Sequence, residues 1–288
     1  MPGLEYRLFY RSFGPEQGAP TILGLHGGPG ASHDYLLPLA DLARDGFRVV
    51  LFDQLGCGRS EVPDGLSHYT LDHHVLETEQ VRLGLGLGRV HLVGSSYGGL
   101  LAIAVALAHP ATLRSLTTVG GLASVPFASA EMDRLRGGLP AEVRAVLDRC
   151  EADGTTSRPE YAAAAMVFYR QFVCRLDPWP AELTRSLELA ATHPVYPYMN
   201  GPSEFTITGT IKDIDLTPQL ARIRVPTLVL GGRFDEVTPR VAEQIYRGIP
   251  GAQHHTFERS AHVPFWEERA AFGRILGAFL RDVDRAHP

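Results

Sequence analysis

Residues 94–98 carry a pattern that limits what this chain can fold into. They read GSSYG, which matches G-x-S-x-G, and they stand between an apolar run at 89–93 and an Ala/Leu-rich run at 100–108. The first run is typical of a buried strand and the second of a buried helix. A sharp strand-to-helix turn of this kind lifts the serine side chain above the end of a parallel sheet. The pattern therefore makes Ser96 a candidate nucleophile, although a tight turn without chemistry has the same letters.

Apolar runs recur on both sides of this turn. We expect strands at residues 4–9, 21–25, 48–52, 89–93, 113–119, 225–230 and 253–257. Helical spacing separates them at residues 35–44, 70–87, 100–108, 240–247 and 265–283, with Thr70 as an N-cap. Strands that alternate with helices and end in glycine-rich turns predict a mostly parallel, doubly wound α/β sheet.

The alternation stops between residues 122 and 209. Segments 141–151, 161–173 and 181–191 have helical spacing, and prolines separate them. We therefore expect residues 1–121 and 210–288 to form an α/β core, with residues 122–209 inserted as a helical cap.

Composition narrows the function classes. A net charge of −5 without a basic run argues against a nucleic-acid partner. The sequence has no run of about 18 apolar residues and no signal-peptide pattern, so we expect no membrane span and a cytoplasmic protein. The 3 cysteines are scattered and the 12 histidines lack metal-ligand spacing, so we expect no disulfide framework, metal or cofactor.

A serine hydroxyl needs a base, and the base needs an orienting carboxylate. After a nucleophile elbow the chain order is serine, then an acid, then histidine. Asp235 follows the strand expected at 225–230, and His262 follows the strand expected at 253–257. Both leave the carboxyl edge of the sheet, where Ser96 should lie. We predict Ser96 as nucleophile, His262 as general base and then acid, and Asp235 as its orienting carboxylate.

Other candidates for these roles fit less well. Asp53 also ends an expected strand, but as the triad acid it would break the chain order. His254 and His255 lie within a strand, which favours a core or surface role. Cys57 stands in a glycine-rich loop without a paired base, which favours a buried thiol.

The oxyanion formed during acyl transfer needs two backbone donors. One is the N–H of Tyr97, directly after the nucleophile, and the other comes from the loop after an early strand. Residues 26–30 read HGGPG, and we expect Gly28 to supply the second donor. Glycine lets the backbone approach a carbonyl oxygen closely, and His26 is expected to brace the loop.

Together these motifs resemble the prolyl iminopeptidase family of α/β-hydrolases, in particular the tricorn-interacting aminopeptidase branch and related amino-acid amidases. The resemblance covers nearly the whole chain. Its motifs are HGGPG at 26–30, DQLGCGRS at 53–60, GSSYGG at 94–99, CRLDPWP at 174–180, MNGPSEF at 199–205 and DEVTP at 235–239. The first three are widespread among hydrolases, whereas the others are more specific.

The resemblance implies an α/β-hydrolase fold and an aminopeptidase that releases an N-terminal amino acid, proline among the candidates, from short peptides or amino-acid amides. It also implies that Glu204 and Glu236 bind the free α-amine of the substrate. Two carboxylates beside a dry pocket can accept charge-assisted hydrogen bonds from an ammonium or prolinium group. A structural salt bridge between cap and core is the alternative for each glutamate.

The chain also departs from the larger branch of this family. It has Tyr97 where that branch has tryptophan, and it lacks that branch's longer Trp/Glu-rich cap signature, so the resemblance does not imply a strict preference for proline. Candidates for an apolar wall around the first side chain are Phe127, Phe168, Tyr169, Trp179, Tyr196, Tyr198 and Phe205.

Two other functions use the same residues. An esterase, lactonase or acyl transferase acting on a specialised metabolite would keep the triad and use the cap differently. A hydrolase-fold receptor would bind a ligand without turnover. Epoxide hydrolases and dehalogenases are disfavoured because they place an aspartate where Ser96 stands.

Overall fold

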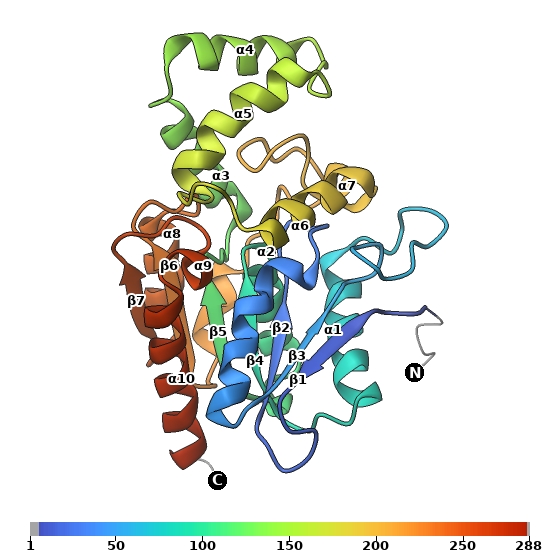
Figure 1. The fold of residues 1–288 in the computed structure, drawn as a ribbon, viewed down its shortest axis with the longest axis vertical. Coiled ribbons are helices and arrows are strands. Elements are labelled where there is room, and N and C mark those ends of the chain that lie inside the picture. Colours follow the sequence, from blue (N-terminus) through green and yellow to red (C-terminus); the bar gives the residue numbers. More distant parts are fainter. Residues whose placement is uncertain (1–5, 287–288) are drawn as a thin grey trace.

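The computed structural model describes residues 6–286, and in this part of the chain seven strands form one sheet. Its order is β1-β3-β2-β4-β5-β6-β7, with β1 antiparallel to β3 and the other neighbours parallel (Figure 1). The strands are β1 (Tyr10–Phe13), β2 (Thr21–Leu25), β3 (Arg48–Phe52), β4 (Val90–Ser95), β5 (Leu113–Val119), β6 (Thr227–Gly232) and β7 (Gln253–Phe257). The predicted α/β class is confirmed.

The first strand begins later than we expected. Residues 4 and 5 of the expected strand lie outside the described part, and residues 6–9 are not a strand. Their backbone bonds to the loop after β3 instead: Asp53 N donates to Phe9 O (2.9 Å) and Glu61 N donates to Arg7 O (2.9 Å). The prediction of a strand at 4–9 was wrong because only Tyr10–Phe13 lies opposite β3.

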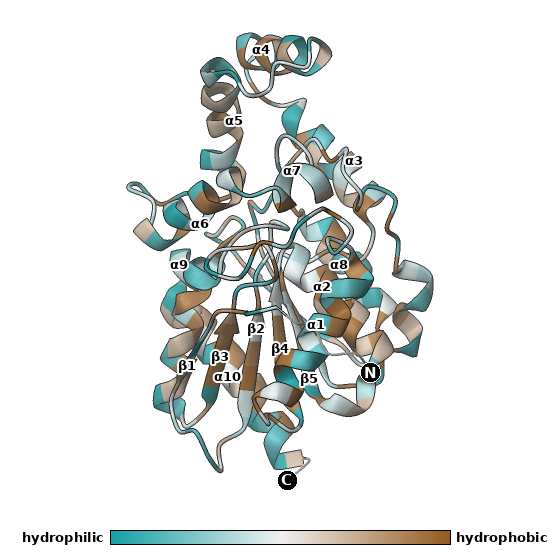
Figure 2. Ribbon diagram, turned by 90° about the vertical axis from the view of Figure 1, so that its right-hand side faces the viewer, coloured by the Kyte–Doolittle hydropathy of each residue, from teal (hydrophilic) through white to brown (hydrophobic). Residues whose placement is uncertain are grey.

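Two helical layers cover the sheet, whose central strands are buried along their length. One layer contains η1 (His33–Asp45), α9 (Pro264–Glu267) and α10 (Arg269–Ala286), and the other contains α1 (Leu71–Gly84), α2 (Tyr97–Ala108) and α8 (Pro239–Gly248). Figure 2 shows apolar residues along the strands. The helix expected at 265–283 is divided at Glu268, whose φ of −127° and ψ of 43° are not helical. Thr70 caps α1 as predicted, because its hydroxyl accepts from His73 N.

Between β5 and β6 the chain forms helices that lie above the carboxyl ends of the strands (Figure 1). They are α3 (Val125–Arg136), α4 (Ala141–Ala152), α5 (Pro159–Phe172), α6 (Ala181–Thr192) and α7 (Val195–Met199). We call residues 122–209 the cap segment. Short helices η2 (Pro110–Thr112) and η3 (Thr217–Arg222) complete the described elements. No helix within residues 6–286 has the length and apolar character needed to cross a membrane.

Candidate active site

The turn between β4 and α2 has a strained backbone at Ser96. Its φ of 57° and ψ of −127° make it the one non-glycine residue with positive φ in the described part of the chain. A side chain at Gly94 would collide with the carbonyl of Gly98, and one at Gly98 with the carbonyl of Leu25. Strain of this kind costs about 1–3 kcal/mol and persists where the surroundings enforce it. The flanking glycines of the G-x-S-x-G pattern are therefore required by backbone contacts.

A histidine–aspartate pair comes from the loops after β7 and β6. His262 Nδ1 lies 2.7 Å from Asp235 Oδ1, which also accepts from Val237 N at 2.8 Å. Both side chains are buried. Burial disfavours the imidazolium, but the carboxylates of Asp235, Glu236 and Glu204 outweigh it and raise the pKa of His262 to about 10. Asp235 thus fixes the ring while His262 lines the same cavity as Ser96.

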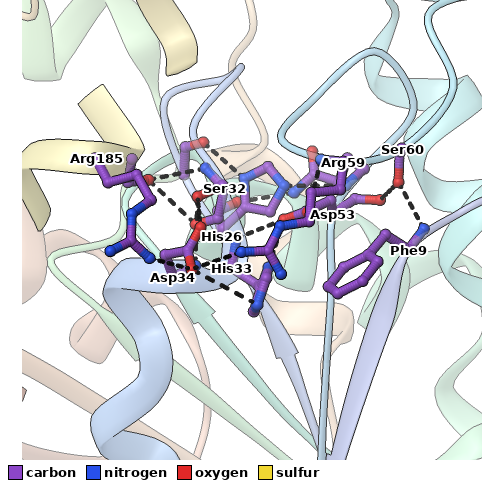
Figure 3. A network of polar contacts seen from close by, with 12 residues as sticks. Phe9, His26, Ser32, His33, Asp34, Asp53, Arg59, Ser60 and Arg185 are labelled. Atoms are coloured by element: carbon purple, nitrogen blue, oxygen red, sulfur yellow. Dashed lines mark hydrogen bonds and ion pairs between the residues drawn. The ribbon is translucent and has the colours of Figure 1, made fainter. Parts of the chain in front are cut away.

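The competing candidates lie in other environments. Asp53 accepts from His33 N (2.6 Å), His33 Nδ1 (2.8 Å) and Arg59 N (3.0 Å), in the polar network of Figure 3. His254 lies on the edge strand β7 and is exposed. Burial raises the pKa of the Cys57 thiol well above its ordinary value, so this side chain stays protonated.

Two glutamates face the same cavity as Ser96: Glu236 is buried and Glu204 is partly buried. Tyr196 Oη donates to Glu204 Oε1 at 2.7 Å, and Glu236 Oε1 lies 3.9 Å from His262 Nε2. Within residues 6–286, neither glutamate forms an ion pair with Arg or Lys, and Glu236 Oε2 has no hydrogen-bond partner. Burial raises the pKa of both, and for Glu236 the charge of Glu204 adds to it.

The HGGPG loop packs directly against the strained turn. The Cα position of Gly27 is so close that a side chain there would lie 2.6 Å from Ser96 Cβ. Gly27 N donates to Tyr35 Oη at 2.7 Å, and Gln54 N donates to His26 Nε2 at 3.0 Å. Gly28 has a φ of 108°, which side chains rarely tolerate. These contacts hold the first two residues of the loop, His26 and Gly27, in place.

Tyr35 is a site residue that the sequence analysis missed. It lies on η1, lines the cavity and is buried, and burial raises its pKa to about 12 so that it remains a hydroxyl. No local motif marks it, because its position depends on how η1 packs beneath the loop.

Tyr97 is held from behind by a second buried pair. His74 Nδ1, on α1, lies 2.7 Å from Tyr97 Oη. Burial lowers the pKa of His74 to about 3, so this imidazole is neutral at ordinary pH. The residue after Ser96 is therefore fixed through its side chain.

The exit of α5 connects the cap segment to both loops of the histidine–aspartate pair. Phe172 O accepts from Glu236 N at 3.1 Å, and Val173 O accepts from His262 N at 3.1 Å. The carboxylate of Glu267 accepts from Arg175 N (2.8 Å) and Ala261 N (2.7 Å). These backbone contacts hold the acid loop and the histidine loop at a fixed separation.

Two adjoining cavities meet at Ser96, and Gly28, Glu204 and Glu236 line both. The lining of the first also includes Ala31, Tyr35, Tyr169, Val173, Leu183, Ser186, Leu187, Ala190, Tyr196, His262 and Val263. The lining of the second also includes Tyr97, Leu100, Leu122, Met132, Asn200, Ile207, Ile211 and Val237. Of the aromatic residues proposed as a wall, Tyr169 and Tyr196 line the first cavity, whereas Phe168 and Phe205 pack on each other with ring centroids 4.7 Å apart.

Comparison with known proteins adds independent findings. The alpha/beta hydrolase fold family matches residues 20–269. A proline iminopeptidase of Saccharolobus solfataricus is 43% identical over 96% of this chain and 89% of that protein. The crystal structure of a proline iminopeptidase from Mycobacterium smegmatis has a TM-score of 0.90 at 36% identity, covering 99% of this chain and 97% of the other. A crystal structure of VinJ has a TM-score of 0.95 at 38% identity, covering 98% and 97%.

Proposed function

Because this chain belongs to the prolyl iminopeptidase family of α/β-hydrolases, and is a hydrolase of that type, we propose that it removes an N-terminal amino acid, proline foremost, from short peptides or amino-acid amides. The relatives that are named proline iminopeptidases support proline as the released residue. The reaction needs a nucleophile, a base, an oxyanion site and a group that binds the free amine, and this chain has candidate residues for each.

In the proposed mechanism the substrate amine binds at Glu204 and Glu236 and offsets two of the three carboxylates that raise the pKa of His262, which brings that pKa down toward the range of a general base. Ser96 Oγ then attacks the carbonyl carbon of the first residue, and its proton passes to His262 Nε2. Asp235 holds the ring through Nδ1 and stabilises the imidazolium. His262 then protonates the leaving nitrogen, the C–N bond breaks, and an aminoacyl ester on Ser96 remains. Water attacks this ester, His262 takes the water proton and returns it to Ser96 Oγ, and the free amino acid leaves.

The backbone N–H groups of Gly28 and Tyr97 are the proposed oxyanion donors. The contacts of Tyr35 with Gly27 and of His74 with Tyr97 support this role, since both hold the neighbouring backbone before substrate arrives. Preorganised donors of this kind are worth about 10²–10³-fold in kcat.

The observation that carries the proposal is the pair of the buried Glu236 and the partly buried Glu204. Each carboxylate faces the cavity of Ser96 without an Arg or Lys partner among the described residues. Burying an anion without a cation is costly, and a substrate ammonium or prolinium group would remove that cost. A substrate with a blocked amine would leave the pair unneutralised, so the site selects for a free N-terminus.

The proposal is tested with proline p-nitroanilide, its N-acetyl form and an uncharged p-nitrophenyl ester. We expect release of nitroaniline from the free amine only, and no turnover of any substrate by Ser96→Ala. Hydrolysis of the ester that is undiminished in Glu204→Ala and Glu236→Ala, without cleavage of the free amine substrate, would favour an esterase, lactonase or acyl transferase. Binding without turnover of any of these compounds would favour a receptor.

We also propose that residues 1–121 and 210–288 form the catalytic core and that residues 122–209 act as a cap. Support comes from the first cavity, where Glu204 and other residues of the cap segment face Ser96 and His262 from the loops at the strand ends. The three cysteines are buried and unpaired, which supports a reducing compartment such as the cytoplasm.

A further inference from the structure

The two cavities at Ser96 differ in which catalytic group they contain. His262 and Val263 line the first cavity with Leu187 and other apolar residues of α6, whereas Ile207 and its neighbours line the second without His262. In the proposed mechanism His262 protonates the leaving nitrogen, so the leaving group must extend on the side of His262. This places the leaving group in the first cavity, and this step rests on the proposed function.

Apart from His262, the ionised side chains that line the two cavities are acids. No Lys or Arg is among the residues described as lining either cavity, and the ionisable acids there are Glu204 and Glu236. The group that can carry a positive charge is His262, and it is already paired with Asp235 at 2.7 Å. An anionic leaving group would therefore enter a cavity that has no free cation to receive it.

One cation stands on α6 beside the first cavity, but it is engaged elsewhere. Arg185 directly precedes Ser186, which lines the cavity. The guanidinium of Arg185 lies 3.5 Å from the buried carboxylate of Asp34, and Figure 3 shows it directed toward that network. Ser186 Oγ itself accepts from Ser32 N at 2.8 Å, so this turn of α6 is fixed on the core.

We propose that this enzyme prefers substrates whose leaving group is uncharged and apolar, such as amino-acid amides, arylamides and peptides with a blocked C-terminus, and that it discriminates against dipeptides with a free C-terminus. In a dipeptide the carboxyl carbon is two bonds from the leaving nitrogen, so the carboxylate lies inside the first cavity. There it is desolvated and shares the site with Glu204 and Glu236, whose two carboxylates are offset by only one positive charge on the substrate amine, and both effects raise its free energy. In a longer peptide the carboxylate lies farther from the glutamates, so the penalty falls with length.

The experiment compares prolyl-leucinamide with prolyl-leucine, which differ only in the charge of the leaving group, by measuring released proline. We expect kcat/KM for the amide to exceed that for the free dipeptide by at least about tenfold, as like charges that meet at a buried site are strongly disfavoured. Equal rates, or faster cleavage of the dipeptide, would overturn the inference and leave the aminopeptidase function intact. Failure to cleave either compound or proline p-nitroanilide would instead overturn the proposed function.

Two matched variants test which cavity holds the leaving group. Leu187→Lys places a cation in the first cavity and should narrow the amide-to-dipeptide ratio, whereas Ile207→Lys places it in the second and should leave the ratio high. The reverse result would overturn the assignment of the leaving group to the first cavity. If Leu187→Lys fails to fold, Ala190→Lys, three residues further along α6, repeats the test. In either case the amide-to-dipeptide ratio of kcat/KM in the wild-type enzyme shows whether the charge of the leaving group matters.

Discussion

Two groups of carboxylates, buried except for the partly buried Glu204, lie near the carboxyl edge of the sheet, and their surroundings differ. Asp34 and Asp53 receive donors from several directions: Asp53 bonds to His33 and to Arg59 N, and Asp34 lies 3.5 Å from Arg185 and 3.9 Å from Arg59 (Figure 3). Burial opposes the ionisation of Asp53, but the hydrogen bonds from His33 and the nearby imidazoles outweigh it and lower its pKa. These carboxylates are satisfied within the fold.

Glu204 and Glu236 have the opposite environment. Glu204 accepts one hydrogen bond from Tyr196, and Glu236 has an oxygen without a partner in the described residues. Burial and mutual repulsion raise the pKa of Glu236 well above its ordinary value. The difference teaches that burial of an acid does not by itself mark a site: the distinguishing property is an unmet need for a cation at a cavity, which a ligand can supply.

The largest predicted effect is on catalysis. Glu204→Gln and Glu236→Gln should each lower kcat/KM for proline p-nitroanilide by about 10²-fold or more, because each removes a charge-assisted bond to the substrate amine. The measurement is steady-state kinetics with each purified variant. If either variant retains wild-type kcat/KM, that glutamate is structural, and the contrast between the two groups no longer reflects function.

The next largest effect is on the free energy of unfolding and concerns Asp53, whose carboxylate is hydrogen-bonded within the fold. Asp53→Asn should lower the free energy of unfolding by about 2–3 kcal/mol, since it weakens hydrogen bonds to a charged, buried acceptor. Urea denaturation monitored by circular dichroism measures this change. Asp45→Asn is the matched control, because Asp45 pairs with Arg281 at a half-exposed position and should cost less than about 0.5 kcal/mol. Equal costs for the two variants would contradict the prediction.

A smaller effect of opposite sign is expected for Glu236. Folding raises its pKa, so the ionised carboxylate costs stability above the unfolded value near pH 4.3, and that cost disappears as the pH falls below it. Glu236→Gln should therefore raise the free energy of unfolding by about 1 kcal/mol at pH 8 and leave it unchanged at pH 4.

Asp53 has a lowered pKa, so its stabilising contribution is present above about pH 3.9 and is lost as the pH falls through its folded pKa.

Thermal unfolding of Glu236→Gln and Asp53→Asn between pH 4 and pH 8 checks the opposite signs. A loss of stability at pH 8 in both variants would show that the two groups do not differ as we infer.

The smallest predicted effect concerns Arg185, the half-exposed partner of Asp34. Arg185→Ala should cost less than about 1 kcal/mol, because its guanidinium is 51% exposed and solvent screens its attraction to Asp34. The comparison with Asp53→Asn separates a buried contact from a surface one in the same network. A cost above 2 kcal/mol would indicate that Arg185 anchors α6 on the core.

Much of this protein could be predicted from local sequence. The α/β class followed from apolar runs alternating with helical spacing, and the strands at 21–25, 48–52, 113–119 and 253–257 have the expected bounds. The turn at Ser96 was predictable from its local pattern because the clash that requires Gly94 is with the backbone of the turn itself, whereas the clash that requires Gly98 is with Leu25 O on the neighbouring strand β2. The sequence likewise predicted that Ser96, Asp235 and His262 lie at the same edge of the sheet, because the carboxyl ends of parallel strands meet at one edge.

The tertiary structure decided what surrounds these residues. The exit of α5 reaches the loops of Asp235 and His262 through contacts between segments far apart in the sequence. Tyr35 reaches Gly27 and Tyr196 reaches Glu204 across shorter spans of chain, through loop conformations that no periodicity encodes. Arg185 lies 3.5 Å from Asp34 across a contact between the cap segment and η1. Propensity and steric rules act over a few residues, whereas the direction of a side chain between two packed elements is set by the elements on both sides.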